Sequence, residues 1–243
     1  MTWPELEYSK SQVKRAGKIL REHHTQILSQ SEDDVAWATS VARNWRQSHA
    51  EAENWAQMGC RSRLGTIGIE GDVTQRLKEL PTIVRKLVRE HPRVQLSTME
   101  DIAGARTVVV SVDDARALAE RWRRVAVDYP IRRDRDYIED PPASGYRAIH
   151  LVLQHKDRLV EVQIRTQIQN AWAELVEDVG HLLGVATKNG EGPADVLEGL
   201  RALSSELASL EPTRQYAGDA DEAASRLSQF WLDVQLHGRS TDG

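Results

Sequence analysis

The sequence predicts an α/β (α+β) protein, in which helices cover one sheet of short strands and extend it at both ends. Segments in which apolar side chains recur at helical spacing alternate with short segments rich in β-branched residues. Two of the strand segments are separated only by the polar turn at residues 155–158, which predicts an antiparallel hairpin. The 243 residues suffice for one large domain or two small ones.

The first predicted element is a helical stretch over residues 9–58, with a cap-like break at residues 31–34. Its apolar positions at helical spacing are Val13, Ala16, Ile19, Leu20, Trp37, Val41, Trp45 and Ala52. Residues 59–71 hold several glycines and are predicted to form a loop. The glycine spacing does not match the loops that cradle phosphates, so we assign no binding role to this segment.

Residues 75–90 return to helical spacing. Pro81 predicts that this helix begins there, because proline is tolerated in a first turn. The elements predicted after it are strands over residues 105–112, 125–129, 146–154 and 159–166 and helices over residues 113–124, 167–183, 194–210 and 219–236.

The strand predicted over residues 159–166 alternates strictly. Alternation places Val160, Val162 and Ile164 on one face, which we expect to be core. The other face then collects an acid, an amide and a guanidinium from Glu161, Gln163 and Arg165. This strand is therefore the one that most clearly combines a structural and a functional face.

The formal net charge of −5 conceals an uneven distribution. Residues 190–243 hold ten acids against four arginines, so the acidity lies in this segment and the first 189 residues are slightly basic. Within that body, residues 76–93 hold six bases against two acids, and residues 116–135 hold seven arginines against three acids. Two basic clusters suit a polyanionic ligand such as a nucleotide, although a solvated helix face would explain either cluster alone.

The composition also argues against several protein classes. The mean hydropathy of −0.53 and the absence of a long apolar run argue against a membrane span, and the polar residues 1–10 argue against a secretory signal. The single cysteine, Cys60, can form no internal disulfide and builds no zinc site by itself. We expect it to be a buried thiol and the protein to be cytoplasmic.

Three clusters of polar side chains lie on or beside apolar elements. They are Arg76, Lys78, Thr82 and Lys86 within a few turns of the predicted helix; Asp101 and Arg106 at the entry of a strand; and Tyr146 and His150 beside Glu161, Gln163 and Arg165 on the neighbouring strand. Two carboxylates at strand ends can hold Mg²⁺ against phosphate oxygens. Lysines can neutralise the remaining phosphate charge, and arginine or tyrosine planes can stack on bases.

Each of these residues alone also has a structural explanation. Asp101 is equally well explained as a turn cap, Glu161 as half of a surface ion pair and Tyr146 as an aromatic of the sheet. Their combination favours a site for nucleotides and a metal.

The same residues fall into four ordered motifs. These are Arg76-x-Lys78-x-x-x-Thr82-Ile83-x-x-Lys86-Leu87; Asp101-Ile-Ala-Gly104-x-Arg106; Asp136-Tyr137-Ile138 with Gly145-Tyr146-Arg147-Ala148-Ile149-His150; and Glu161-Val-Gln163-Ile-Arg165-Thr166 with Trp172-Ala173. Together they resemble the synthetase domain of the RelA/SpoT family, whose members make the alarmones (p)ppGpp by moving pyrophosphate from ATP to the ribose 3′-hydroxyl of GDP or GTP. The resemblance implies a mixed, largely antiparallel, nucleotidyltransferase-like sheet covered by helices. It divides the chain into an N-terminal helical segment (1–58), a synthetase core (59–189) and acidic C-terminal helices (190–243).

The resemblance also implies roles for individual positions. Arg76 and Arg106 would sandwich the adenine of ATP, and Lys78 and Lys86 would hold its phosphates, with Thr82 standing where the family usually has serine. Asp101 would be a Mg²⁺ ligand, and Glu161 would be a second ligand or the group that activates the attacking hydroxyl. Tyr146 would stack on the guanine of the acceptor. The junction of the two nucleotides would be lined by His150, Gln163 and Arg165, and the acceptor phosphates would face the basic run Arg132, Arg133 and Arg135.

Some positions depart from the family pattern, and three hypotheses follow. Pro142 and Ser144 stand where a lysine and an asparagine are common, and Val176-Glu177 stands where many members have a Glu-His pair. The leading hypothesis is a monofunctional GTP/GDP pyrophosphokinase. The alternatives are a toxic relative that pyrophosphorylates the tRNA 3′ end and a degenerate nucleotide-binding or interaction module.

The family's hydrolase domain is not expected. His23-His24 is followed by no matching aspartate pattern, so the sequence resembles the small alarmone synthetases. Flanking helices often mediate oligomerisation in that group, so the resemblance implies a homo-oligomer that forms through the terminal helices.

Overall fold

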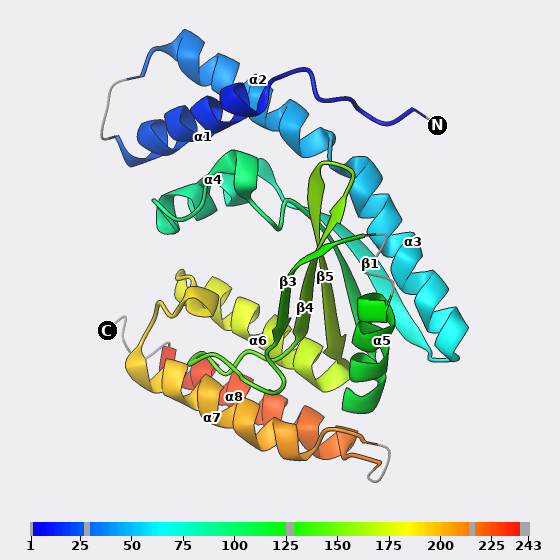
Figure 1. The fold of residues 1–243 in the computed structure, drawn as a ribbon. Coiled ribbons are helices and arrows are strands. Elements are labelled where there is room, and N and C mark those ends of the chain that lie inside the picture. The colour runs from blue at the N-terminus through cyan, green and yellow to red at the C-terminus, as the bar shows by residue number, and fades with distance from the viewer. Residues whose placement is uncertain (1, 27–29, 125–128, 214–216, 239–243) are drawn as a thin grey trace.

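The computed structural model describes residues 2–26, 30–124, 129–213 and 217–238 (Figure 1). Its helices are α1 (Lys10–Thr25), α2 (Glu32–Gln47), α3 (Ala50–Ile67), α4 (Leu80–Arg89), α5 (Val112–Arg124), α6 (Gln167–Leu183), α7 (Ala194–Ser209) and α8 (Ala220–Gly238), with short 3₁₀ turns at Leu96–Thr98 and Thr187–Asn189. Its strands are β1 (Gly71–Leu77), β2 (Ala103–Val109), β3 (Ile131–Asp136), β4 (Ile149–His155) and β5 (Arg158–Thr166). No helix in the described part of the chain is both long and apolar enough to cross a bilayer.

The strands form one five-stranded sheet in the order β1-β2-β5-β4-β3. Only β2 and β5 run parallel, and the other three pairs are antiparallel. The predicted hairpin is confirmed as β4 and β5, and the mixed, largely antiparallel sheet is confirmed as well. Strands β2, β5 and β4 thus lie in the interior of the sheet, and β1 and β3 lie at its edges.

One face of the sheet is packed and the other is polar. Figure 1 shows α3 and α5 on one side of the sheet and α4 and α6 on the other. The packed face buries Val160, Val162 and Ile164 of β5 completely, as their alternation predicts, together with Cys60 of α3 and Trp122 of α5. Because side chains alternate along a strand, the remaining positions point to the opposite side. We call that side the polar face.

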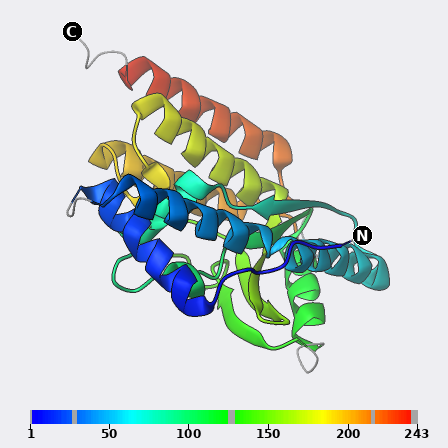
Figure 2. The same cartoon turned by 90° about the horizontal axis from the view of Figure 1, so that it is seen from above.

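The N-terminal helices divide between two clusters. Helix α3 packs on the sheet, as expected, whereas α1 and α2 pack mainly on each other and on α4 (Figure 2). Their shared core includes Val13, Val41 and Trp45 with Ile83 and Leu87 of α4. The sequence predicts that the N-terminal helices up to Met58 pack on the sheet, which is correct for α3 and wrong for α1 and α2.

Several predicted boundaries are also corrected. The loop predicted over residues 59–71 is helical as far as Ile67, and a Cβ at Gly59 would lie 2.6 Å from the Trp122 ring, so a glycine allows α3 and α5 to approach. Residues 75–90 are not one helix: they contain the end of β1 and then α4, with Pro81 in its first turn as predicted. Strand β3 was not predicted. Of the predicted strand at residues 125–129, positions 125–128 lie outside the described residues.

The C-terminal helices form a third cluster. Helix α6 begins after Thr166, whose side chain accepts a hydrogen bond from the Gln169 amide in a capping box, so its predicted start is confirmed. Trp172 of α6 packs with Leu200 and Leu203 of α7 and donates its indole N–H to the Leu200 carbonyl at 2.9 Å. These contacts hold α7 close to the polar face of the sheet.

Candidate active site

The register of the sheet gathers the predicted site residues into two rows across the polar face. Directly paired residues point to the same side of a sheet. The first row runs across all five strands and contains Thr74, Arg106, Gln163, His150 and Arg135. The second row, one pleat along, contains Arg76, Gly104 and Glu161. Residues as many as 89 positions apart in the sequence, Thr74 and Gln163, therefore share one surface of the sheet.

At one end of this surface two lysines share one carboxylate oxygen. Lys78 Nζ lies 2.7 Å and Lys86 Nζ 2.8 Å from Asp101 Oδ2. The other oxygen, Oδ1, is buried and has no hydrogen-bond partner among the described residues. We call Lys78, Lys86 and Asp101 the donor triad, after the role in binding ATP and Mg²⁺ that the resemblance implies for them. An ionised carboxylate oxygen without a partner is available as a ligand for a hard cation.

The pKa values of the triad reflect burial and charge together. Burial on its own raises the pKa of Asp101, but the charges and hydrogen bonds of both lysines lower it by a larger amount. The net pKa therefore lies below the ordinary aspartate value. Burial lowers the pKa of Lys78 more than Asp101 raises it. Asp101 is therefore a carboxylate at neutral pH.

Two arginines lie beside the triad on the same face. Arg76 of β1 and Arg106 of β2 are diagonal neighbours, and neither side chain makes a hydrogen bond or ion pair within the described residues. Burial lowers the pKa of Arg106, and the positive charges of Arg165 and Arg76 add to this effect. The nearby acid is Glu177 of α6, whose pKa is lowered by Lys188 and these two arginines against the effect of its burial. Two unpaired guanidinium planes can accommodate an anion or a flat base.

At the other end of the surface, five side chains form a closed ring of hydrogen bonds. The ring runs from Glu161 Oε1 to His150 Nδ1 (2.9 Å), from His150 Nε2 to Tyr146 Oη (2.7 Å), and from Tyr146 Oη to Arg165 Nη2 (2.7 Å). It closes from Arg165 Nη2 to Gln163 Oε1 (3.3 Å) and from Gln163 Nε2 to Glu161 Oε2 (2.6 Å). We call Glu161, His150, Tyr146, Arg165 and Gln163 the acceptor ring, after the place beside the acceptor nucleotide that the resemblance implies for them.

The directions of donation in the ring follow from its chemistry. Arginine can only donate, so the Tyr146 oxygen accepts from Arg165 and its O–H donates to His150 Nε2. The Glu161 carboxylate can only accept, so His150 Nδ1–H donates to it. Burial on its own raises the pKa of Glu161, but the hydrogen bonds from His150 and Gln163 outweigh it and the net pKa is low. Both oxygens of Glu161 are therefore held in place in the ionised form.

The loop that carries Tyr146 is anchored by α7. Arg201 Nε donates to the Ala143 carbonyl at 2.6 Å, and the Ser204 hydroxyl donates to the Gly145 carbonyl. Gly145 has φ +84°, and a Cβ there would lie 3.1 Å from the Ser204 Cβ, so both its conformation and its packing require glycine. Neither Arg201 nor Ser204 was predicted from the sequence, because the periodicity of a helix does not show that the helix meets a loop about 60 residues earlier.

The structure thus brings together most of the predicted site residues, with differences in detail. Arg76 lies on β1, not on a helix with Lys86, and Tyr146 lies before β4, not within it. Thr82 is on α4, where its hydroxyl accepts from Arg85 at 3.1 Å, and no bond joins it to the donor triad within the described residues. Arg135 donates to the Tyr137 hydroxyl at 2.8 Å, and Tyr137 packs edge-on against Tyr146 and His150. Tyr137 is thus a neighbour of the acceptor ring that sequence analysis did not assign.

The carboxylates of this surface fit a metal that is completed by substrate. Within the described residues no group of three or more His, Cys, Asp or Glu side chains could hold a metal ion. Asp101 and Glu161 are close enough for the Asp101 charge to raise the pKa of Glu161, and Asp101 Oδ1 has no partner. Mg²⁺ commonly binds one or two carboxylates and takes its other ligands from water and phosphates. These two carboxylates meet that requirement.

Known proteins share this sequence and arrangement. The family described as "Region found in RelA / SpoT proteins" matches residues 75–180. The GTP pyrophosphokinase YjbM of Bacillus subtilis is 32% identical over 167 residues, which are 65% of this chain and 76% of that protein. An uncharacterized protein of Mycobacterium tuberculosis is 34% identical over 130 residues, which are 53% of this chain and 46% of that relative, so the match spans less than half of its length.

Solved structures agree with the sequence matches. The small alarmone synthetase 1 of Bacillus subtilis, bound to its product pppGpp, superimposes with a TM-score of 0.53 at 31% identity, covering 68% of this chain and 87% of that chain. A TM-score above 0.5 indicates that the two proteins share a fold. With three quarters of a relative covered at more than 30% identity, the chain belongs to the RelA/SpoT family.

Proposed function

We propose that this protein is a (p)ppGpp synthetase, which transfers pyrophosphate from ATP to the ribose 3′-hydroxyl of GDP or GTP. The observation that carries the proposal is that two carboxylates lie on the same face of the sheet. Asp101 belongs to the cationic cluster at one end, and Glu161 belongs to the hydrogen-bonded ring at the other. Phosphoryl-type transfer depends mainly on positioning and on neutralising charge. The small alarmone synthetase with the same fold carries pppGpp, which supports guanosine nucleotides as the acceptor class.

The donor triad and the arginine pair suit the ATP. Lys78 and Lys86 would leave Asp101 Oδ2 in part to neutralise the phosphates, and Arg76 and Arg106 would hold the adenine between their planes. Asp101, with Glu161, would hold Mg²⁺, which when bound neutralises phosphate charge and orients the transferred group. This arrangement explains why two buried lysines share a carboxylate whose second oxygen has no partner.

The acceptor ring suits the guanosine nucleotide. In the reaction the 3′-oxygen forms a bond to the β-phosphorus, the bond between that phosphorus and the α-phosphate oxygen breaks, and AMP leaves. Glu161 is an oriented carboxylate that can accept the proton of the attacking hydroxyl, and His150 fixes its position. Tyr146 would stack on the guanine, and Arg135 with the neighbouring Arg132 and Arg133 would face the acceptor phosphates.

The test is an assay of the purified protein with Mg²⁺, ATP and either GDP or GTP. The expected products are AMP and a 3′-pyrophosphorylated guanosine nucleotide. Glu161→Ala should abolish their formation, whereas the control variant Glu174→Ala, which replaces an exposed acid on α6, should still form them. A folded wild-type protein that forms no such product would overturn the proposal. Comparing GDP with GTP as acceptor also ranks the two substrates.

The altered acceptor loop favours one alternative for direct comparison. Pro142 and Ser144 remove a cation and an amide that the family commonly has, and α7 holds this loop through Arg201. Label from ATP that appears in the 3′ end of tRNA and not in free guanosine nucleotides would select the tRNA-modifying reading. ATP binding without turnover in calorimetry would instead select the degenerate binding module.

Other expectations stay predictions. A homo-oligomer through the terminal helices is checked by light scattering on the purified protein, and a cytoplasmic location by fractionation. The division at residues 58 and 189 is checked by limited proteolysis.

A further inference from the structure

The peptide that carries Lys78 is held from both sides. Its N–H donates to the carbonyl of Ile102 at 2.8 Å, next to Asp101 in the chain. Its carbonyl accepts from Arg46 Nε at 2.8 Å, and Arg46 Nη2 also reaches the Leu77 carbonyl at 3.4 Å. Strand β1 ends at Leu77, so the Lys78 carbonyl has no ladder partner and Arg46 supplies one.

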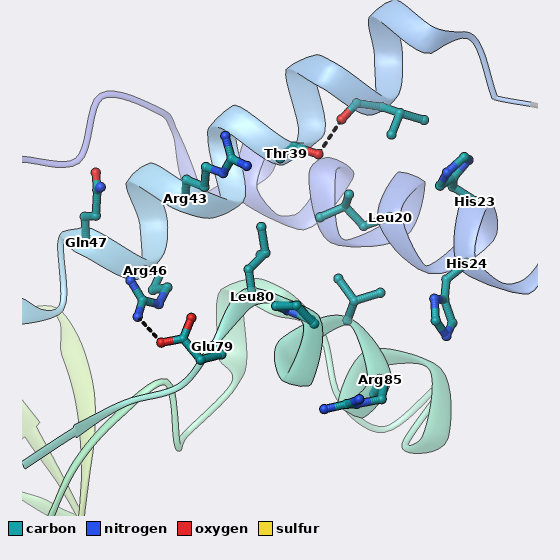
Figure 3. Close-up of a pocket in the computed structure, with 13 residues that line it drawn as sticks. Leu20, His23, His24, Thr39, Arg43, Arg46, Gln47, Glu79, Leu80 and Arg85 are labelled. Carbon is teal, nitrogen blue, oxygen red and sulfur yellow. Dashed lines mark hydrogen bonds and ion pairs between the residues drawn. The ribbon is translucent and has the colours of Figure 1, made fainter.

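Arg46 reaches this turn from the last turn of α2. Figure 3 shows it at one end of a cavity of about 680 Å³ between α1, α2 and α4, where its guanidinium also pairs with Glu79 at 2.9 Å. The Glu79 side chain is 75% exposed, so this ion pair contributes little, whereas the bonds to the two carbonyls are charge-assisted and more sheltered. The planar fork of arginine spans consecutive carbonyls in a way that a lysine ammonium cannot.

The bonds of Arg46 act on the same residue that joins the donor triad. The Lys78 side chain contacts Asp101 and its amide contacts Ile102, so a shift of this peptide moves Nζ relative to the carboxylate and to any phosphate beside it. Arg76 lies two residues earlier on β1 and would shift with it. Arg46 itself lies outside the segment that the RelA/SpoT family description matches.

We propose that Arg46 is a positioning residue for the donor nucleotide, which fixes the β1–α4 turn so that Lys78 and Arg76 meet ATP in one geometry. The inference rests on the proposed function. Under this proposal the α1–α2 pair supports the donor end of the site through Arg46, in addition to packing on α4.

The test measures donor and acceptor separately in Arg46→Ala and wild type. KM for ATP should rise about tenfold while KM for GDP stays within about twofold, because only the donor side of the site loses its support. Binding of a non-hydrolysable ATP analogue with Mg²⁺, followed by calorimetry, should weaken by a similar factor. Arg46→Lys keeps the charge but not the fork, so it should recover only part of the loss and also serves if Arg46→Ala fails to fold.

Arg43→Ala is the matched control. Arg43 lies one turn earlier on α2, lines the same cavity and makes no hydrogen bond or ion pair within the described residues (Figure 3). Its replacement should leave both KM values and ATP affinity unchanged. A lower kcat with unchanged KM values, or an equal rise in both KM values, would show a merely structural role for Arg46 and overturn the proposal.

A second readout does not depend on the proposed reaction. Amide hydrogen exchange in residues 76–80 should be about tenfold faster in Arg46→Ala than in Arg43→Ala, because the turn loses two of its anchors. Unchanged exchange there would overturn the inference even if the wild type is an active synthetase. Faster exchange in a protein that binds no ATP would support the anchoring role and contradict the proposed function instead.

Discussion

The two ends of the polar face are held together by different physics. At the donor end, two lysines converge on one oxygen of Asp101, its second oxygen has no partner, and two arginines are unpaired within the described residues. At the acceptor end, each side chain of the ring is hydrogen-bonded to both of its neighbours in the ring. The donor end is thus built from charges that await a counter-charge, whereas the acceptor end is already organised by hydrogen bonds.

The largest effect is expected where the two ends meet, at Glu161. Glu161→Gln keeps the size of the side chain and one acceptor oxygen for the ring but removes the negative charge between donor and acceptor. We expect kcat to fall about 1,000-fold because both proton acceptance and metal ligation are lost. The measurement is AMP release at saturating nucleotides.

ATP affinity provides the contrast for Glu161→Gln. The affinity for the ATP analogue, measured by calorimetry, should change by less than about tenfold, because the lysines and arginines proposed to bind ATP remain. A variant that retained more than a tenth of wild-type kcat would show that Glu161 only braces the ring.

A smaller effect is expected from removing the charge of the donor triad. In Asp101→Asn the two ammonium groups lose the carboxylate that they share, so kcat/KM for ATP should fall about 100-fold and the Mg²⁺ concentration needed for half-maximal rate should rise. KM for the acceptor should not change. Asp72→Asn, an exposed acid at the start of β1, is the control, and an equal loss of acceptor affinity would contradict the separation of the two ends.

The contrast between central and edge strands explains how much of the fold could be predicted. Central strands β2, β4 and β5 each have one buried face, and their apolar, β-branched sequences predicted their positions. Strict alternation in β5 also predicted that Glu161, Gln163 and Arg165 share one side of the sheet. Edge strands β1 and β3 are mostly exposed on both faces, so no period of two is visible in their sequences. Both were missed for this reason.

The donor end was misplaced for a related reason. Leu77 at the end of β1 and Leu80, Ile83 and Leu87 of α4 all contribute to one cluster with α1 and α2. Their spacing therefore imitates a single helix, although two elements carry it. Contacts such as Arg46 to Lys78 or Ser204 to Gly145 join residues 32 and 59 positions apart and leave no local pattern.

A buried acid at the end of β5 gives a prediction about stability. Thr166, the residue after Arg165, donates its hydroxyl to Glu211 Oε1 at 2.8 Å, and Glu211 Oε2 is buried without a partner in the described residues. Burial raises the pKa of Glu211 to about 7. The folded protein therefore keeps a proton that the unfolded chain releases above its ordinary glutamate pKa.

The sign of the pH dependence follows from linkage. The stabilising contribution of Glu211 is fully present below the unfolded pKa and is lost as pH rises through about 7. Glu211→Gln removes this dependence, so at pH 8 the variant should be more stable than wild type by about 3 kcal/mol, with little advantage at pH 4.5. Denaturant unfolding at both pH values measures this, with Glu198→Gln on α7 as control. A constant difference between the two pH values would mean that Glu211 does not titrate on folding.

The smallest effect is expected from Tyr146→Phe, which opens the acceptor ring at one atom. The ring loses the oxygen that accepts from Arg165 and donates to His150, but the aromatic surface for the guanine remains. We expect kcat/KM for the acceptor to fall about tenfold and ATP affinity to stay constant, because His150 and Arg165 lose one shared hydrogen-bond partner each.

Tyr137→Phe is the matched control, since Tyr137 packs edge-on against the same residues and its hydroxyl only accepts from the exposed Arg135. It should change acceptor kinetics by less than about twofold. If Tyr146→Phe were as active as Tyr137→Phe, the closed ring would not be what organises the acceptor end. The two ends of the polar face would then both be held by charge, and a bound nucleotide would have to supply the order that the ring supplies here.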